Sequence, residues 1–103
     1  MVQKARYILQ TTVDIPADQE KEFNEWYNQV HVPEIIKCPG FLSARRLRSV
    51  QGPGPRYIAI YEIEHEKVLE TPEFNKARGW HRFAPLVIDP KPTIYQEIFY
   101  AES

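Results

Sequence analysis

The sequence predicts an α+β domain in which helices cover one face of a four-stranded antiparallel sheet. Four segments are rich in β-branched and aromatic residues, and two others carry apolar residues at helical spacing. Their order along the chain is strand, helix, strand, strand, helix, strand. With 103 residues, 43% of them hydrophobic, the chain has the size and apolar content of one domain. We therefore expect a single domain over residues 1–103.

The first strand is expected over residues 5–13, ARYILQTTV, because five of these nine residues are β-branched or aromatic. Pro16 and the acidic residues that follow it are typical of a helix start, so a helix is predicted over residues 16–30. Pro33 predicts that this helix ends by Val32. One apolar stripe of the helix would consist of Phe23, Trp26, Tyr27, Val30 and His31.

The next two strands are predicted over residues 41–50 and 56–64, where apolar and polar side chains alternate. The turn KCPG, residues 37–40, precedes the first of them. The stretch QGPGP, residues 51–55, predicts a hairpin between them, so the two strands should pair antiparallel.

The second helical region is predicted to begin near His65 and to restart at Thr71, whose hydroxyl can cap a helix that starts with Pro72. Gly79 weakens this helix. Its apolar face would hold Phe74, Ala77 and His81. A loop framed by Pro85, Pro90 and Pro92 and a last strand over residues 93–100 complete the chain.

This order of elements is the split βαβ, or ferredoxin-like, arrangement. In the third strand, apolar residues occupy both faces, because Ile58 and Ile60 oppose the set Tyr57, Ala59, Tyr61 and Ile63. Helices would cover only one face, and the other needs a partner. A second copy of the sheet would close a two-subunit barrel, so a homodimer is expected.

The charge and composition of the chain argue against several classes of partner. A net charge of −1, from 13 basic and 14 acidic side chains, argues against nucleic acid as a partner. The single Cys38 fits a structural thiol in a reducing compartment. No leader and no membrane-spanning run is recognisable, so we expect a cytoplasmic protein without a membrane partner.

Residues 22–46, EFNEWYNQVHVPEIIKCPGFLSARR, carry an aromatic pair, His31 with Pro33, and a Pro-Gly-Phe turn before a strand that ends in arginines. This run resembles the dimeric α+β barrel superfamily, particularly its EthD-like branch and related uncharacterised small proteins. The resemblance implies a homodimer with a pocket between sheet and helices in each subunit. The superfamily uses such pockets for cofactor-free cyclases, isomerases, decarboxylases and monooxygenases and for haem enzymes, so the reaction does not transfer with the fold.

His31 is the leading catalytic candidate, because its helical spacing from Phe23 and Tyr27 directs it toward the sheet, where an imidazole can serve as general acid or base. The alternative is a histidine that only interacts with the last carbonyls of its helix. The resemblance implies that a histidine at this position lines the pocket in related enzymes. Tyr61 and His81 are further catalytic candidates, and each could equally be a packing residue.

Arg45 and Arg46 should point to opposite faces of their strand, and an inward Arg46 could hold a carboxylate or phenolate. Arg48 fits a solvated edge charge, as Glu34 and His65 fit exposed positions. The three histidines lack metal-ligand spacing, and no phosphate loop or nucleophile motif is present. We expect no metal and no cofactor, since a haem would need more room than two short helices readily leave.

These residues predict a cofactor-independent enzyme for a small aromatic or polyketide-like carbonyl compound, with His31 moving a proton next to the carbonyl. The reaction would be a cyclisation, isomerisation, elimination or decarboxylation. A non-catalytic dimer that binds a small hydrophobic molecule and a cofactor-free monooxygenase of an aromatic substrate are the alternatives. The aromatic walls of the site would be Phe23, Trp26, Tyr27, Tyr61, Trp80 and Phe83.

Overall fold

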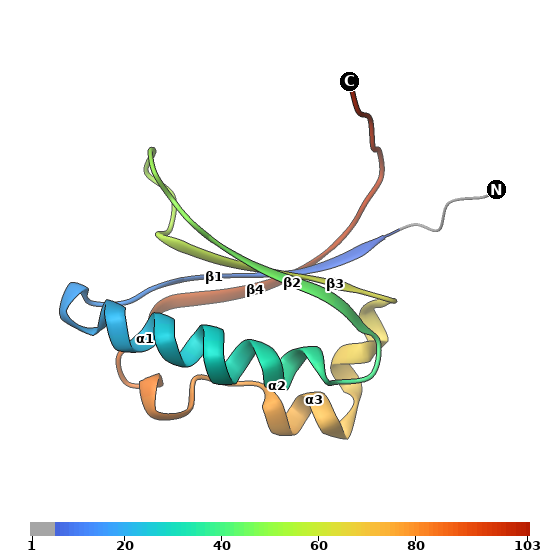
Figure 1. The fold of residues 1–103 in the computed structure, drawn as a ribbon. Helices are drawn as coiled ribbons and strands as arrows, with labels where there is room; N and C mark the ends of the chain where they lie inside the picture. The colour runs from blue at the N-terminus through green and yellow to red at the C-terminus, as the bar shows by residue number, and fades with distance from the viewer. Residues whose placement is uncertain (1–5) are drawn as a thin grey trace.

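The sheet and its helical cover form two layers in the computed structural model, which describes residues 6–103 (Figure 1). The strands are β1 (Tyr7–Asp14), β2 (Phe41–Arg48), β3 (Tyr57–Ile63) and β4 (Ile88–Gln96). They lie in the order β2-β3-β1-β4, and every neighbouring pair is antiparallel. The predicted ferredoxin-like fold is confirmed. Of the strand predicted over residues 5–13, position 5 lies outside the described residues.

The first helical segment continues past Pro33, so its predicted end was wrong. A 3-10 turn (Ala17–Gln19) leads into α1 (Glu20–Trp26), then a π-helical turn (Tyr27–His31) and α2 (Val32–Ile36). Pro33 has no N–H to donate and its ring crowds the preceding turn. The wider π turn before it accommodates the proline, and such turns often occur at functional sites.

The second helical segment is shorter than predicted. After a 3-10 turn (Glu66–Glu70), α3 (Pro72–Ala77) begins on the Thr71 hydroxyl, which accepts a hydrogen bond from the Phe74 N–H. Gly79 and His81 then have φ angles of 106° and 49°, which no α-helix contains. His81 therefore lies in a separate 3-10 turn (His81–Phe83), and its expected place on the same helix as Phe74 was wrong.

The last strand begins at Ile88 and ends at Gln96, whereas residues 93–100 were predicted. Pro90 and Pro92 lie inside it, and Pro92 pairs with Thr11 of β1. Because β4 is at the edge of the sheet, a proline nitrogen that cannot donate can face away from β1. The loop predicted around these two prolines is therefore part of the sheet.

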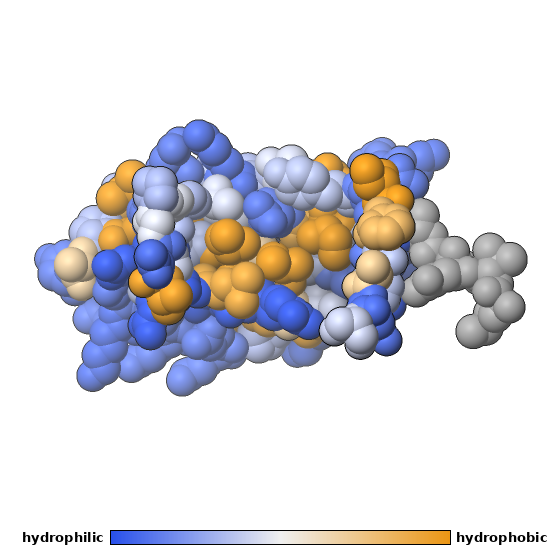
Figure 2. Space-filling model, turned by 90° about the horizontal axis from the view of Figure 1, so that it is seen from above, coloured by the Kyte–Doolittle hydropathy of each residue, from blue (hydrophilic) through white to orange (hydrophobic). Residues whose placement is uncertain are grey.

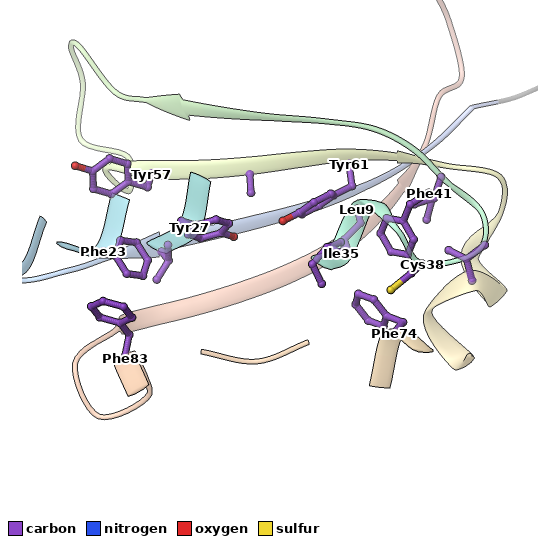
Figure 3. Packing of buried hydrophobic residues seen from close by; sticks show 14 of the residues in the cluster. Leu9, Phe23, Tyr27, Ile35, Cys38, Phe41, Tyr57, Tyr61, Phe74 and Phe83 are labelled. Atoms are coloured by element: carbon purple, nitrogen blue, oxygen red, sulfur yellow. The ribbon is translucent and has the colours of Figure 1, made fainter. Parts of the chain in front are cut away.

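The hydrophobic core lies between the sheet and the helices (Figure 3). From the sheet it receives alternate residues such as Leu9, Val13 and Ala59. The opposite sheet face has no helix over it (Figure 1), and apolar side chains gather at its centre (Figure 2). This uncovered face contains Ile8, Ile58, Ile60, Leu47 and Tyr95 by strand alternation and register.

Gly40, in the turn before β2, should not tolerate a side chain. Its φ is +85°, and a Cβ there would lie 2.2 Å from Cγ1 of the buried Val68. We expect Gly40→Ala to lower the free energy of unfolding by about 2–4 kcal/mol, from backbone strain and overpacking together. Urea denaturation measures this loss. Gly52→Ala is the matched control, since Gly52 has φ +109° but no atom near its Cβ, and an equal loss there would rule out the clash.

Candidate active site

A cavity of about 400 Å³ opens between the sheet and the helical layer. Its apolar walls come from all parts of the fold and include Leu9, Ile35, Leu69, Phe74, Trp80 and Ile94. Its polar lining consists of Thr11, Tyr27, His31, Tyr61 and Arg78. The cavity therefore offers a mainly hydrophobic volume of small-molecule size with a few polar groups, the composition typical of ligand sites.

His31 ends the π-helical turn and is 6% exposed. Its ring stacks on Trp26, with centroids 4.7 Å apart and 13° between the planes, and meets the edge of Tyr27 at 5.0 Å. The Nδ1 atom is buried and has no hydrogen-bond partner among residues 6–103. The side chain lines the cavity, but its Nδ1 atom is buried. Nε2 is therefore the ring nitrogen available to a ligand.

The charge state of His31 follows from this environment. The pKa of the imidazole is lowered to about 4, mainly by burial and to a smaller extent by the nearby His81 and Arg46. The ring is therefore neutral at pH 7, with one nitrogen free to accept a proton.

Two tyrosines bring hydroxyl groups to the same cavity. Tyr61 comes from β3 and Tyr27 from the π-helical turn, and their hydroxyls point toward each other (Figure 3). Burial raises the pKa of both, and within residues 6–103 the Tyr61 hydroxyl has no partner other than the hydroxyl of Tyr27. Both hydroxyls are protonated at neutral pH, so either can donate a hydrogen bond to a ligand oxygen.

Four of the predicted site residues line the cavity: His31, Tyr27, Tyr61 and Trp80. The other five do not. Phe23 and Phe83 are packed in the core with ring centroids 5.3 Å apart. Trp26 stacks on the His31 ring and is not part of the cavity lining. The expectation that these three rings form cavity walls therefore needs correction.

His81 and Arg46 are also placed outside the cavity lining. The His81 ring is exposed, 6.1 Å from the His31 ring. Arg46 points to the helical side, as predicted, but its guanidinium lies 4.1 Å from the Tyr27 ring centroid and donates hydrogen bonds to Asn24 and Asn28. The intervening Tyr27 ring separates Arg46 from the cavity.

The chain is similar to one described protein family. The model of a family described as a domain of unknown function, DUF4286, matches residues 6–82, which is more than half of the chain. The chain belongs to the DUF4286 family. A comparison with curated proteins finds no match.

Solved structures share the fold of this DUF4286 domain. A candidate monooxygenase from Shewanella loihica has a TM-score of 0.72 at 20% identity, over 96% of this chain and 100% of that one. The haem degrader MhuD from Mycobacterium tuberculosis, solved with two haems in its active site, has a TM-score of 0.70 at 19% identity, over 93% and 99%. An EthD-family protein from Bacillus halodurans has a TM-score of 0.67 at 18% identity, over 92% and 100%. These similarities show that the DUF4286 domain shares the fold of these proteins.

The cavity of the DUF4286 domain is also lined by residues that were not predicted from the sequence. Thr11 lines the cavity from β1 and Arg78 from the loop after α3, together with Pro90 and Pro92 of β4. Thr11 could have been found, because it is polar between Leu9 and Val13 on the inward side of its strand. Arg78 and the prolines had no comparable signal, since their positions depend on the loop and strand bounds.

Two further properties concern only the described part of the DUF4286 domain. Across residues 6–103, no group of three or more His, Cys, Asp or Glu side chains is arranged to hold a metal ion. Within the same range, every helix is too short or too polar to cross a membrane.

The buried imidazole predicts a specific pH dependence of stability in this DUF4286 domain. The pKa of His31 is about 4 in the folded protein against a usual 6.5, so between these values the unfolded chain binds more protons. The contribution of the buried, neutral His31 to the free energy of unfolding is therefore complete above pH 6.5 and is lost as the pH falls toward 4. This loss is at most about 3 kcal/mol. Urea denaturation at pH 7 and pH 4.5 should show a smaller loss in His31→Gln than in the wild type. Equal losses in the two proteins would contradict a depressed pKa.

Proposed function

We propose that this protein is a cofactor-independent enzyme that moves a proton on a small aromatic or polyketide-like carbonyl compound, with His31 as the general base. One observation carries the proposal: a neutral, buried imidazole and the buried hydroxyl of Tyr61, whose one partner among the described residues is the Tyr27 hydroxyl, line the same mainly apolar cavity. A buried polar group without a partner is costly, and a ligand that supplies the partner recovers that cost.

In the proposed reaction, the substrate carbonyl oxygen accepts a hydrogen bond from Tyr61 or Tyr27. Nε2 of His31 takes the proton from the carbon next to the carbonyl, and the C–H electron pair forms the enolate. The tyrosine donors stabilise the developing oxyanion. The negative charge also raises the pKa of His31, so the imidazolium forms where its counter-charge lies.

The next step of the enolate then determines which reaction is completed. Return of the proton at another carbon completes an isomerisation, and attack of the enolate carbon on a second carbonyl completes a cyclisation. Expulsion of a leaving group completes an elimination. The apolar walls, including Ile35, Leu69 and Trp80, exclude water and so strengthen the hydrogen bonds to the oxyanion.

A cofactor-free oxygenation is the second candidate, because it begins with the same substrate anion and consumes O2 afterwards. It is supported by the monooxygenase names of two structural relatives, from Shewanella loihica and Nitrosomonas europaea. The third candidate is a binding protein that uses the cavity without proton transfer.

We further propose that the enzyme is a homodimer joined through the uncovered sheet face. Apolar side chains gather on that face (Figure 2), and strand alternation places Ile58 and Ile60 there. An apolar patch of this kind is typical of an interface. The chain after β4 rises on the same side (Figure 1), with Ile98 and Phe99 94% and 81% exposed. A second copy would cover both features.

The experiment that tests the function measures proton exchange and oxygen use together. A panel of aromatic and polyketide-like β-dicarbonyl compounds is incubated with the protein in D2O, and deuterium at the carbon next to the carbonyl is followed by NMR with an oxygen electrode in parallel. Deuterium uptake without O2 consumption is expected. Substrate-dependent O2 consumption would favour the oxygenase, and tight binding with no exchange would leave only the binding protein.

A further inference from the structure

A second concave site lies on the outer side of α1 and β2, away from the cavity. This groove, of about 530 Å³, has a polar lining that includes Arg45, Arg46, Arg48 and Asn28. It shares no lining residue with the cavity described above. The Tyr27 ring, under the guanidinium of Arg46, separates the two spaces.

The groove carries three positive charges without a matching acid. Within residues 6–103, no salt bridge involves Arg45, Arg46 or Arg48, and no acidic side chain lines the groove. Arg45 and Arg48 are exposed charges at the sheet edge, where such residues also discourage strand pairing. Edge protection does not require Arg46, which is partly buried.

Arg46 is a cation in an unusual position. Its Nη1 and Nη2 atoms donate to the amide oxygens of Asn28 and Asn24, at 2.8 and 2.9 Å, and its Nε is buried with no partner. Within residues 6–103, its counterparts are neutral amides and the faces of Phe23, Tyr27 and Tyr57. A partly desolvated guanidinium gains most from a charged hydrogen-bond acceptor, and its forked geometry suits carboxylate and phosphate groups.

We propose that this groove is a second ligand site, which binds an organic anion through a carboxylate or phosphate group. Arg46 and Arg48, which share one side of β2, take the anionic group, and Val32 and Ala44 contact the apolar body of the ligand. The site is separate from the proposed reaction, so it stands whether or not the cavity is catalytic. Its ligand class follows from charge and shape: a cationic rim next to a short apolar surface selects an amphipathic anion over a neutral molecule.

The test uses phenylacetate and inorganic phosphate as probes in calorimetric titrations of the full chain. Phenylacetate should bind, and Arg46→Gln and Arg48→Gln should each weaken its binding at least about tenfold. Arg78→Gln is the matched control, since Arg78 lines the cavity, and it should stay within about twofold of the wild type. Phosphate binding as tight as that of phenylacetate would support phosphate esters as the source of the anionic group.

Three results would overturn the proposal. Loss of binding in Arg78→Gln would assign the probe to the cavity, and unchanged binding in both Arg46→Gln and Arg48→Gln would remove these arginines from the site. Absence of binding of both probes at millimolar concentration also counts against it.

Discussion

His31→Gln is expected to lower kcat/KM for proton exchange by about 10²–10⁴-fold, the usual contribution of a general base. Glutamine keeps a polar side chain of similar length in the cavity, but its amide cannot accept a proton at neutral pH. The stacked contact with Trp26 is lost, so the fold is checked by circular dichroism alongside the rate. Exchange of deuterium into the substrate, measured by NMR, gives the rate directly.

His65→Gln is the matched control for this variant. His65 is exposed, and its Nδ1 accepts a hydrogen bond from the Lys67 N–H at the start of a 3-10 turn, outside the cavity lining. Its substitution should leave the rate unchanged. An unaltered rate in His31→Gln, or an equal loss in the two variants, would end the case for His31 as the base.

The pH profile of the wild type provides an independent check on the same residue. Because the pKa of His31 is about 4 in the free protein, kcat/KM should be level from pH 6 to 8 and should fall below about pH 5. A fall centred near pH 6.5 would indicate an ordinary exposed histidine as the group that titrates.

Ile60→Lys is expected to separate the proposed dimer, with a dissociation constant raised more than a hundredfold. Ile60 lies near the centre of the uncovered sheet face, between Gln10 of β1 and Arg45 of β2. A lysine there would bury an unpaired charge at the interface, which costs about 3 kcal/mol or more. In the lone subunit the same side chain reaches solvent, so the fold should persist. Light scattering during size-exclusion chromatography measures the mass across a range of concentrations.

Val30→Lys is the control for the dimer, since Val30 is 42% exposed on the helical layer instead of the sheet face. Its mass should equal that of the wild type. A wild-type protein that is already monomeric at high concentration would remove the dimer proposal, as would an Ile60→Lys variant that stays dimeric.

Sequence patterns were most informative where local preferences and tertiary packing agree. In β3, strict alternation placed Tyr57, Ala59, Tyr61 and Ile63 on one face, and all four are buried under the helices. The spacing of Phe23, Tyr27 and His31 likewise placed three side chains on the inner side of one helix, where all three are buried. Burial of an alternating or helical stripe is a direct consequence of its periodicity.

Errors arose where a proline or a loop was interpreted from local rules alone. Pro33 ends most helices, but here a π turn accommodates it and the helical segment continues to Ile36. Pro90 and Pro92 disfavour an interior strand, but only the order of strands in space shows that β4 is at an edge. Local propensity contains no information on which strand becomes the edge.

The sequence by itself determined the order of the elements, the inward face of each and the histidine and tyrosines that meet between sheet and helices. Only the tertiary structure decided which of these groups reach the cavity. Phe23 lies in the core and Trp26 stacks on His31, so neither lines the cavity. Thr11 and Arg78, which were not predicted, do line it. The physical reason is that periodicity sets the direction of a side chain relative to its own element. The empty space beside that side chain depends on how distant elements pack.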